Sequence, residues 1–257
     1  MRGGYAVSWL TSCPFSAALD MPDNLFRCCV KHRLGLAVLF DGGDSHGHYN
    51  LAHSEGGRTN ARHTGLVHVW RQIFIEAGGQ VPDRNVERLL RQSHLPVPAD
   101  DLRRLDLIVP GLNVHHGLPL FCDITILSPI TRKGTARGGT SNKGGGLFNR
   151  VERENNETYH EVLESGLGAL FCLACETYGR FNSVSTTLIE DLAREKTRGI
   201  HHRVRTGLKL SLIKRWMSLL TMSLQKAVAI AIVRGAGADL PTTLLEPVPA
   251  LSDLQYN

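Results

Sequence analysis

Two short apolar runs decide the fold predicted for this chain: Leu105-Asp-Leu-Ile-Val-Pro-Gly111 and Leu120-Phe-Cys-Asp-Ile-Thr-Ile126. Each run is rich in β-branched and large apolar residues and is closed by a turn signal, which predicts a buried strand. The segment between the runs, residues 110–119, has the length of a hairpin connection. The sequence therefore predicts two neighbouring buried strands.

Each predicted strand carries one aspartate, Asp106 in the first and Asp123 in the second. A carboxylate inside an apolar strand costs free energy unless a cation or a hydrogen-bond donor meets it. Two such carboxylates on neighbouring strands suggest a shared cation. The alternative is that each aspartate caps a turn or pairs with Arg103 or Arg104, which lie close in the sequence.

The composition fits a globular protein of the nucleus or cytoplasm rather than a secreted or membrane protein. A chain of 257 residues can bury one large core or two small ones. It is 42% hydrophobic and 21% charged, which is too polar for a membrane protein. The apolar stretch Ala227–Val233 is too short to span a bilayer, and the first residues lack the apolar core of a secretory signal.

Basic side chains exceed acidic ones, 29 to 24, and favour an anionic partner. They concentrate in residues 194–215, where Glu195 is the only acid, and in the glycine-rich stretch 131–146, which we expect to be a mobile loop. Candidate nucleic-acid contacts are Arg132, Lys133, Lys143, Arg203, Arg205 and Lys209. The alternative is an ordinary loop and a solvated helix face.

Hydrophobic spacing predicts an α/β order of helices and strands around one central sheet. The expected helices are 62–77, 85–92, 147–163, 184–196 and 208–233, and 169–175 is a third strand. The predicted divisions are an irregular segment with a possible degenerate zinc knuckle (1–61), an α/β domain (62–206), a basic amphipathic helix (207–234) and a flexible tail (235–257).

Several phrases, taken in order, resemble a known family over residues 62–234. They include Asp101-Leu-Arg-Arg-Leu-Asp-Leu-Ile-Val-Pro-Gly111, Gly117-Leu-Pro-Leu-Phe-Cys-Asp-Ile-Thr-Ile126, Asn156-Glu-Thr-Tyr159 and Gly168-Ala-Leu-Phe-Cys-Leu-Ala-Cys-Glu-Thr-Tyr-Gly-Arg180. The set resembles the restriction-endonuclease-like domain that closes the reverse-transcriptase polyproteins of one branch of non-LTR retrotransposons, and it is similar to retroelement proteins of dinoflagellates and related protists. The resemblance implies a restriction-endonuclease-like core, a small mixed sheet flanked by helices, with an irregular N-terminal segment and a long C-terminal helix.

The resemblance also implies an endonuclease of the type written PD-(D/E)xK, which nicks target DNA for insertion. Such enzymes hold Mg²⁺ or Mn²⁺ with two carboxylates. Asp106 matches the first carboxylate, with Leu105 where the family prefers proline, and Asp123 matches the second. The implied partners are DNA, the element RNA as a further candidate, and a reverse transcriptase domain that this sequence does not contain.

The family lysine is the part of the motif that this chain lacks. Thr125 occupies its position on the strand, and Asn155 occupies the position that retrotransposon members use, one helical turn before Tyr159. Two functions therefore remain: an active endonuclease, or a catalytically inactive remnant that only binds nucleic acid. Arg150, Arg153 or Lys143 could replace the lysine.

Two further metal roles are predicted from acids and histidines outside the aspartate pair. Glu87 is a candidate third acid for the magnesium site, with an exposed helix residue as the alternative. Family members carry a Cys/His knuckle before a Gly-Gly…Arg-His phrase, and Zn²⁺ ligands are therefore sought among Cys28 or His32, His48, His53 and His63. The alternative is a degenerate finger without zinc.

Overall fold

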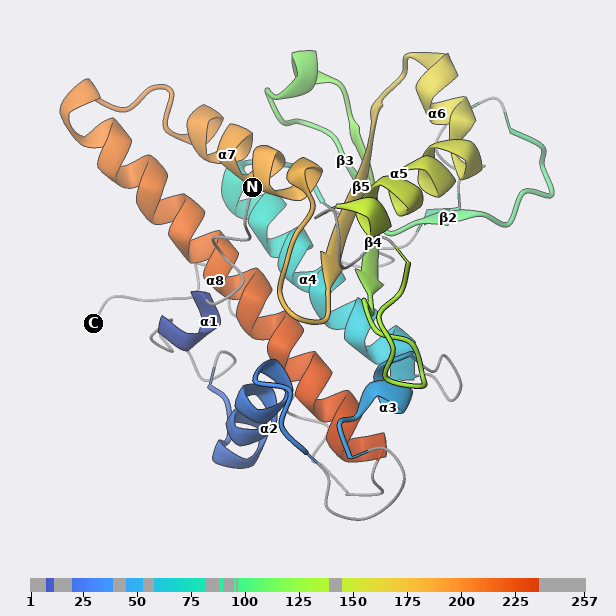
Figure 1. The fold of residues 1–257 in the computed structure, drawn as a ribbon. Coiled ribbons are helices and arrows are strands. Elements are labelled where there is room, and N and C mark those ends of the chain that lie inside the picture. Colours follow the sequence, from blue (N-terminus) through green and yellow to red (C-terminus); the bar gives the residue numbers. More distant parts are fainter. Residues whose placement is uncertain are drawn as a thin grey trace.

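The central sheet has three strands in the order β3-β4-β5 (Figure 1). The computed structural model describes residues 8–11, 20–38, 45–52, 58–81, 88–89, 95, 97–138 and 145–235. Strand β3 (Leu107–Val109) pairs antiparallel with β4 (Leu120–Leu127), and β5 (Ala169–Glu176) pairs parallel with β4. The predicted hairpin and the third strand are confirmed.

A second, two-stranded sheet joins β1 (Arg88–Leu89) to β2 (Arg104–Leu105) in antiparallel register. The helix predicted for residues 85–92 is therefore wrong at residues 88–89, where the backbone pairs with a distant strand. Asp106 lies at a bend between β2 and β3, whereas the sequence predicted one unbroken strand. The bend takes the Asp106 backbone out of the strand ladder.

The helices occur where apolar residues recur at helical spacing, with two differences from the prediction. Their bounds are α1 Ser8–Thr11, α2 Asp23–Arg33, α3 His48–Ala52, α4 Arg58–Ala77, α5 Gly146–Thr158, α6 His160–Ser165, α7 Ser183–Lys196 and α8 His202–Gly235. The helix predicted over 147–163 is broken at Tyr159, which has non-helical angles (φ −118°, ψ 37°). The N-terminal segment is less irregular than expected, because α2 and α3 lie within it.

The helices cover the sheet on two sides (Figure 1). On one side, Cys122 and Ile124 of β4 join a large core built with residues of α2, α4, α7 and α8. On the other side, Phe121 packs with residues at the α5–α6 junction, and Cys172 of β5 packs with α5. Because side chains alternate along a strand, Asp123 points to this second side, between two apolar clusters.

The predicted long C-terminal helix is present as α8, and most of it is buried in the core, although the sequence predicted a basic amphipathic helix over residues 207–234. From Trp216 to Ile232 every residue except Ser223 is buried, whereas residues 202–208 are exposed. Among the described residues, His202–Arg234 is one helix long and apolar enough to cross a membrane, and 89% of its most apolar window is buried inside the protein. The short stretch Ala227–Val233 is thus the end of a longer apolar helix, which packs against α2, α4 and α7.

We expect a pH-dependent loss of stability from His32 on α2. This side chain is 2% exposed, and burial, followed by the neighbouring His48, Arg33 and His46, lowers its pKa to about 4. The unfolded chain binds the proton near pH 6.5, so the free energy of unfolding should fall as the pH drops below 6.5, by about 2 kcal/mol between pH 7.5 and 5. Urea unfolding in EDTA over this range should show a steeper decline for the wild type than for His32→Gln; equal slopes would contradict the assignment.

Candidate active site

The structure brings the two predicted aspartates together, Asp106 at the bend before β3 and Asp123 on the neighbouring strand β4. In the antiparallel pairing of β3 with β4, Leu107 lies opposite Cys122. Asp106, the residue before Leu107, therefore comes next to Asp123, the residue after Cys122. The Ile124 backbone N–H donates to Asp106 Oδ2 at 2.6 Å, which holds the Asp106 carboxylate against β4 beside Asp123. Asp106 can reach this N–H because the bend at residue 106 turns its side chain, rather than its backbone, toward β4.

Asp123 lies in a partly buried position surrounded by hydrogen-bond donors. Thr125 Oγ1 donates to Asp123 Oδ2 at 3.1 Å, and the Asn155 side chain also hydrogen-bonds to this carboxylate. Burial, followed by the charge of Asp106, raises the pKa of Asp123 above its ordinary value, although the two hydrogen bonds and His63 oppose the shift. A buried carboxylate whose pKa is raised by a second carboxylate beside it favours a nearby cation.

Asn155 lies on α5, which covers this side of the sheet, and Tyr159 lies at the junction between α5 and α6. Both side chains are buried, at 6% and 7% exposure. Asn155 Oδ1 is a buried acceptor without a hydrogen-bond partner, and such atoms are rare in folded proteins. The Tyr159 hydroxyl donates to the Arg104 carbonyl at 2.5 Å, and burial, followed by Asp123 and Asp106, raises its pKa. Tyr159 therefore remains a protonated donor beside the acid pair.

His63 is the residue of this site that the sequence assigned to a different role. Its Nε2 lies 3.1 Å from Asp106 Oδ2. Burial lowers the pKa of His63, but the hydrogen bond and charge of Asp106 outweigh it, and the net shift is upward. The signal available in the sequence was helical spacing: His63 precedes Val67 and Trp70 by one and two turns, on the stripe that faces the core.

The acid pair has the donor atoms of a magnesium site rather than those of a zinc site. Within the described ranges, no three His, Cys, Asp or Glu side chains are grouped so that they could hold a metal ion. The acid pair instead combines two carboxylates with the unpartnered amide oxygen of Asn155. Mg²⁺ is commonly held by one or two carboxylates together with water and substrate phosphate, so these oxygens fit it.

The predicted zinc set is not brought together. Cys28 is part of the hydrophobic core, and burial raises the pKa of its thiol to about 11, which disfavours the thiolate that zinc needs. His63 lies at Asp106, while His48 is on α3 beside His46 and His32. His53 lies outside the described residues, as does Glu87. Among the described residues, Cys28, His48 and His63 therefore do not form a group that could hold zinc.

The candidate nucleic-acid residues lie on two separate surfaces. Arg132 and Lys133 are exposed on a turn after β4 that is closed by a bridge between Ile130 and Ala136, so the first part of the predicted mobile loop is ordered. Arg203, Arg205 and Lys209 lie on the first turns of α8, beyond the end of α7 (Figure 1). Lys143 lies outside the described residues.

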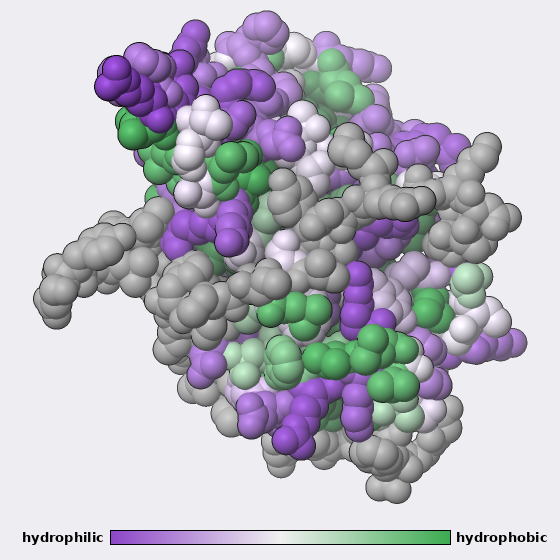
Figure 2. Space-filling model, turned by 60° about the vertical axis from the view of Figure 1, so that its left-hand side comes forward, coloured by the Kyte–Doolittle hydropathy of each residue, from purple (hydrophilic) through white to green (hydrophobic). Residues whose placement is uncertain are grey.

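The surface at the start of α8 is strongly polar. Figure 2 shows hydrophilic side chains gathered at the top of this face, where α7 leads into α8. Arg203 and Arg205 are exposed, and Arg205 donates to the Ile200 carbonyl at 2.8 Å. This surface is separated from the acid pair by α7 and the sheet, because α8 and Asp123 lie on opposite sides of the strands.

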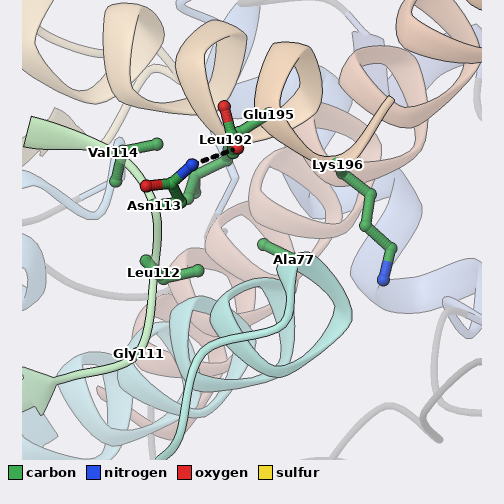
Figure 3. Close-up of a pocket in the computed structure, with 8 residues that line it drawn as sticks. All are labelled: Ala77, Gly111, Leu112, Asn113, Val114, Leu192, Glu195 and Lys196. Carbon is green, nitrogen blue, oxygen red and sulfur yellow. Dashed lines mark hydrogen bonds between the residues drawn. The ribbon is translucent and has the colours of Figure 1, made fainter. Parts of the chain in front are cut away.

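A small pocket lies between the end of α4, the β3–β4 connection and α7 (Figure 3). Its volume is about 280 Å³, which is at the lower limit for small-molecule sites. Asn113 Nδ2 donates to Glu195 Oε1 at 2.7 Å across it, so its polar side chains already satisfy each other. None of the predicted site residues lines this pocket, and we assign it no function.

No protein-family model and no curated protein sequence matches this chain. Function is therefore inferred from the acid pair and the residues around it.

Proposed function

We propose that the chain is a Mg²⁺-dependent DNA endonuclease domain of a retroelement-derived protein, of the restriction-endonuclease-like type, which nicks target DNA for insertion. One observation carries the proposal: Asp106, at the bend before β3, and Asp123 on β4 converge with Asn155 of α5 and with Tyr159, which follows α5. A mixed sheet flanked by helices, with Asp106 just before its first strand and Asp123 on its second, also fits this type.

Asp106, Asp123 and the amide oxygen of Asn155 would hold Mg²⁺ or Mn²⁺. When bound, the ion would lower the pKa of a water molecule and stabilise the charge of the phosphate under attack. Asn155 Oδ1 supports this assignment, because a cation would give this buried oxygen the partner that it lacks.

The other residues of the site orient the two acids. His63 Nε2 and the Ile124 N–H both bind Asp106 Oδ2, so the second oxygen of Asp106 remains for the ion. Thr125 fixes Asp123 from the same strand. Ligands held in this way need little reorganisation when the ion and phosphate bind.

One observation favours the second function, a catalytically inactive remnant that binds nucleic acid. The side chain in the family's lysine position is the neutral Asn155, and a neutral amide cannot offset the charge of a phosphate. Arg150 and Arg153, two candidate substitutes, are exposed on α5 and lie within 4 Å of Glu154 and Glu157, respectively. We therefore expect a slow enzyme if activity survives.

DNA, with the element RNA as a further candidate, would contact the basic surfaces at Arg132 and Lys133 and at Arg203, Arg205 and Lys209. Phosphate contacts of this kind need positive charge rather than a defined sequence. A reverse transcriptase domain as a partner, and a nuclear or cytoplasmic site of action, complete the proposal.

Nicking of supercoiled plasmid by the purified chain tests the proposal. We expect open-circular product with Mg²⁺ or Mn²⁺ and none with EDTA. If the plasmid stays intact with both metals, the endonuclease proposal is contradicted, and the inactive remnant that only binds nucleic acid becomes the better explanation.

A further inference from the structure

Arg103 ties the segment before Asp106 to the junction between α5 and α6 (Figure 1). Its guanidinium binds both carboxylate oxygens of Glu161 on α6, at 2.5 and 3.0 Å, and donates to the Thr158 carbonyl at the end of α5. It also donates to Asp101 Oδ2 at 2.6 and 3.0 Å, and the Arg103 backbone N–H donates to Asp101 Oδ1 at 2.8 Å. A single side chain therefore joins three acceptor groups from two distant segments of the chain.

The contact with Thr158 follows from the break in the helix at Tyr159. In a continuous helix the Val162 N–H would bind the carbonyl four residues back, which is that of Thr158. It binds the Tyr159 carbonyl instead, at 3.0 Å, so the Thr158 carbonyl needs another donor. Arg103 supplies this donor, and its positive charge lies at the C-terminal end of α5, where the helix dipole favours it.

Tyr159 makes a second link next to the first. Its hydroxyl donates to the Arg104 carbonyl at 2.5 Å. Arg103 and Arg104 precede Asp106 by three and two residues, so the two links join the Asp106 bend to the helix that carries Asn155. The position of Asn155 and Tyr159 relative to the acid pair therefore depends on both links.

We propose that Arg103 is a positioning residue of the acid pair: it holds the α5–α6 junction and thereby sets Asn155 and Tyr159 against the two aspartates. This inference rests on the endonuclease function proposed above. Two carboxylates already match the charge of Arg103, so it is a poor replacement for the family's lysine at a phosphate. The hydrogen bonds to Asp101, followed by those to Glu161, raise the pKa of Arg103 above its ordinary value, and the bridge therefore stays charged at neutral pH.

Single-turnover nicking of plasmid with Mg²⁺ tests the role of Arg103. Arg103→Gln should lower the rate at saturating DNA at least about ten-fold, because a misplacement of about 1 Å can cost a hundred-fold. The DNA concentration that gives half the maximal rate should stay the same, since Arg103 acts through the helix junction and not on a phosphate. Arg103→Lys keeps the charge but lacks the planar fork that spans two carboxylates, and it should be nearly as slow. A wild-type rate in Arg103→Gln, or weaker DNA binding with an unchanged rate, would overturn the proposal.

The matched control is Arg180→Gln, which removes a comparable ion pair at the other end of α5. Arg180 binds both carboxylate oxygens of Glu176 and lies over the Phe148 ring, 5.3 Å from its centroid. Its side chain is 27% exposed, against 30% for Arg103. Arg180→Gln should lower the melting temperature about as much as Arg103→Gln and leave the nicking rate unchanged. Equal loss of rate in both variants would indicate a general loss of stability and overturn the proposal.

Fluorine NMR of the chain labelled with 3-fluorotyrosine gives a readout that needs neither metal nor DNA. The chain has five tyrosines, and Tyr159→Phe assigns the Tyr159 signal. Because Tyr159 is 7% exposed, its signal should show little solvent isotope shift between H₂O and D₂O in the wild type and in Arg180→Gln. In Arg103→Gln the shift should grow as the junction opens.

The fluorine signal also separates the role of Arg103 from the endonuclease function. An unchanged Tyr159 signal in Arg103→Gln would overturn the positioning role even in an active enzyme. A wild type that does not nick, with a Tyr159 signal that responds to Arg103→Gln, would contradict the endonuclease and support the role of Arg103 at the junction. Arg103→Lys, which keeps the charge balance, provides the same test if Arg103→Gln melts below the assay temperature.

Discussion

Replacing Asp123 by alanine is expected to lower Mg²⁺-dependent nicking of supercoiled plasmid by about a thousand-fold or more. Asp123 is the acid on which Thr125 and Asn155 converge, and its pKa is raised by burial and by the charge of Asp106. Its loss removes one of the two carboxylates proposed for the ion. The measurement is the rate at which open-circular plasmid appears with saturating Mg²⁺ or Mn²⁺.

Two variants separate this effect from unfolding and from changes in net charge. Asp191→Ala removes a carboxylate from α7, where it pairs with Arg194 at 2.5 Å, and should nick at the wild-type rate. Asp123→Ala should melt no lower than the wild type in EDTA, because it removes a buried charge beside a second acid. Equal nicking by wild type and Asp123→Ala would point to a contaminating nuclease or a different site.

Replacing Asn155 by lysine is expected to raise the nicking rate at least about ten-fold, because a cation there can stabilise phosphate charge in the transition state. Asn155 is buried, hydrogen-bonds to Asp123 and lies one turn before Tyr159. The two acids should keep the ammonium charged. Single-turnover nicking at neutral pH measures the gain.

The control for added charge is Asn149→Lys, on the exposed side of the same helix. It should strengthen DNA binding slightly without changing the single-turnover rate. A gain shared by both variants would indicate improved DNA binding rather than chemistry. No nicking by either variant, with both chains folded, would favour the remnant that only binds nucleic acid.

The parts of the fold that the sequence predicted are those set by local pattern. β4 and β5 are predominantly apolar runs, and α4 and α7 carry apolar stripes at helical spacing, so their positions needed no knowledge of distant contacts. The pairing of Asp106 with Asp123 followed from the length of the connection between their strands. Asn155 and Tyr159 followed from a resemblance in motif order and lie where that order implied.

The parts that the sequence did not predict depend on contacts between distant segments. Helix α8 looked amphipathic because its first turns are basic, yet the rest is surrounded by α2, α4 and α7. Residues 88–89 form a strand because they pair with residues 104–105. His63 was grouped with other histidines as a zinc ligand because the sequence does not show that α4 passes beside Asp106.

The most direct test of the acid pair as a metal site is a crystal structure of the chain soaked with Mn²⁺, with anomalous scattering used to locate the ion. We predict one anomalous peak coordinated by a carboxylate oxygen of Asp106 and one of Asp123, and its absence in crystals of Asp123→Ala. A wild-type crystal without this peak, in which the two carboxylates are held only by His63, Thr125 and backbone N–H groups, would contradict the account.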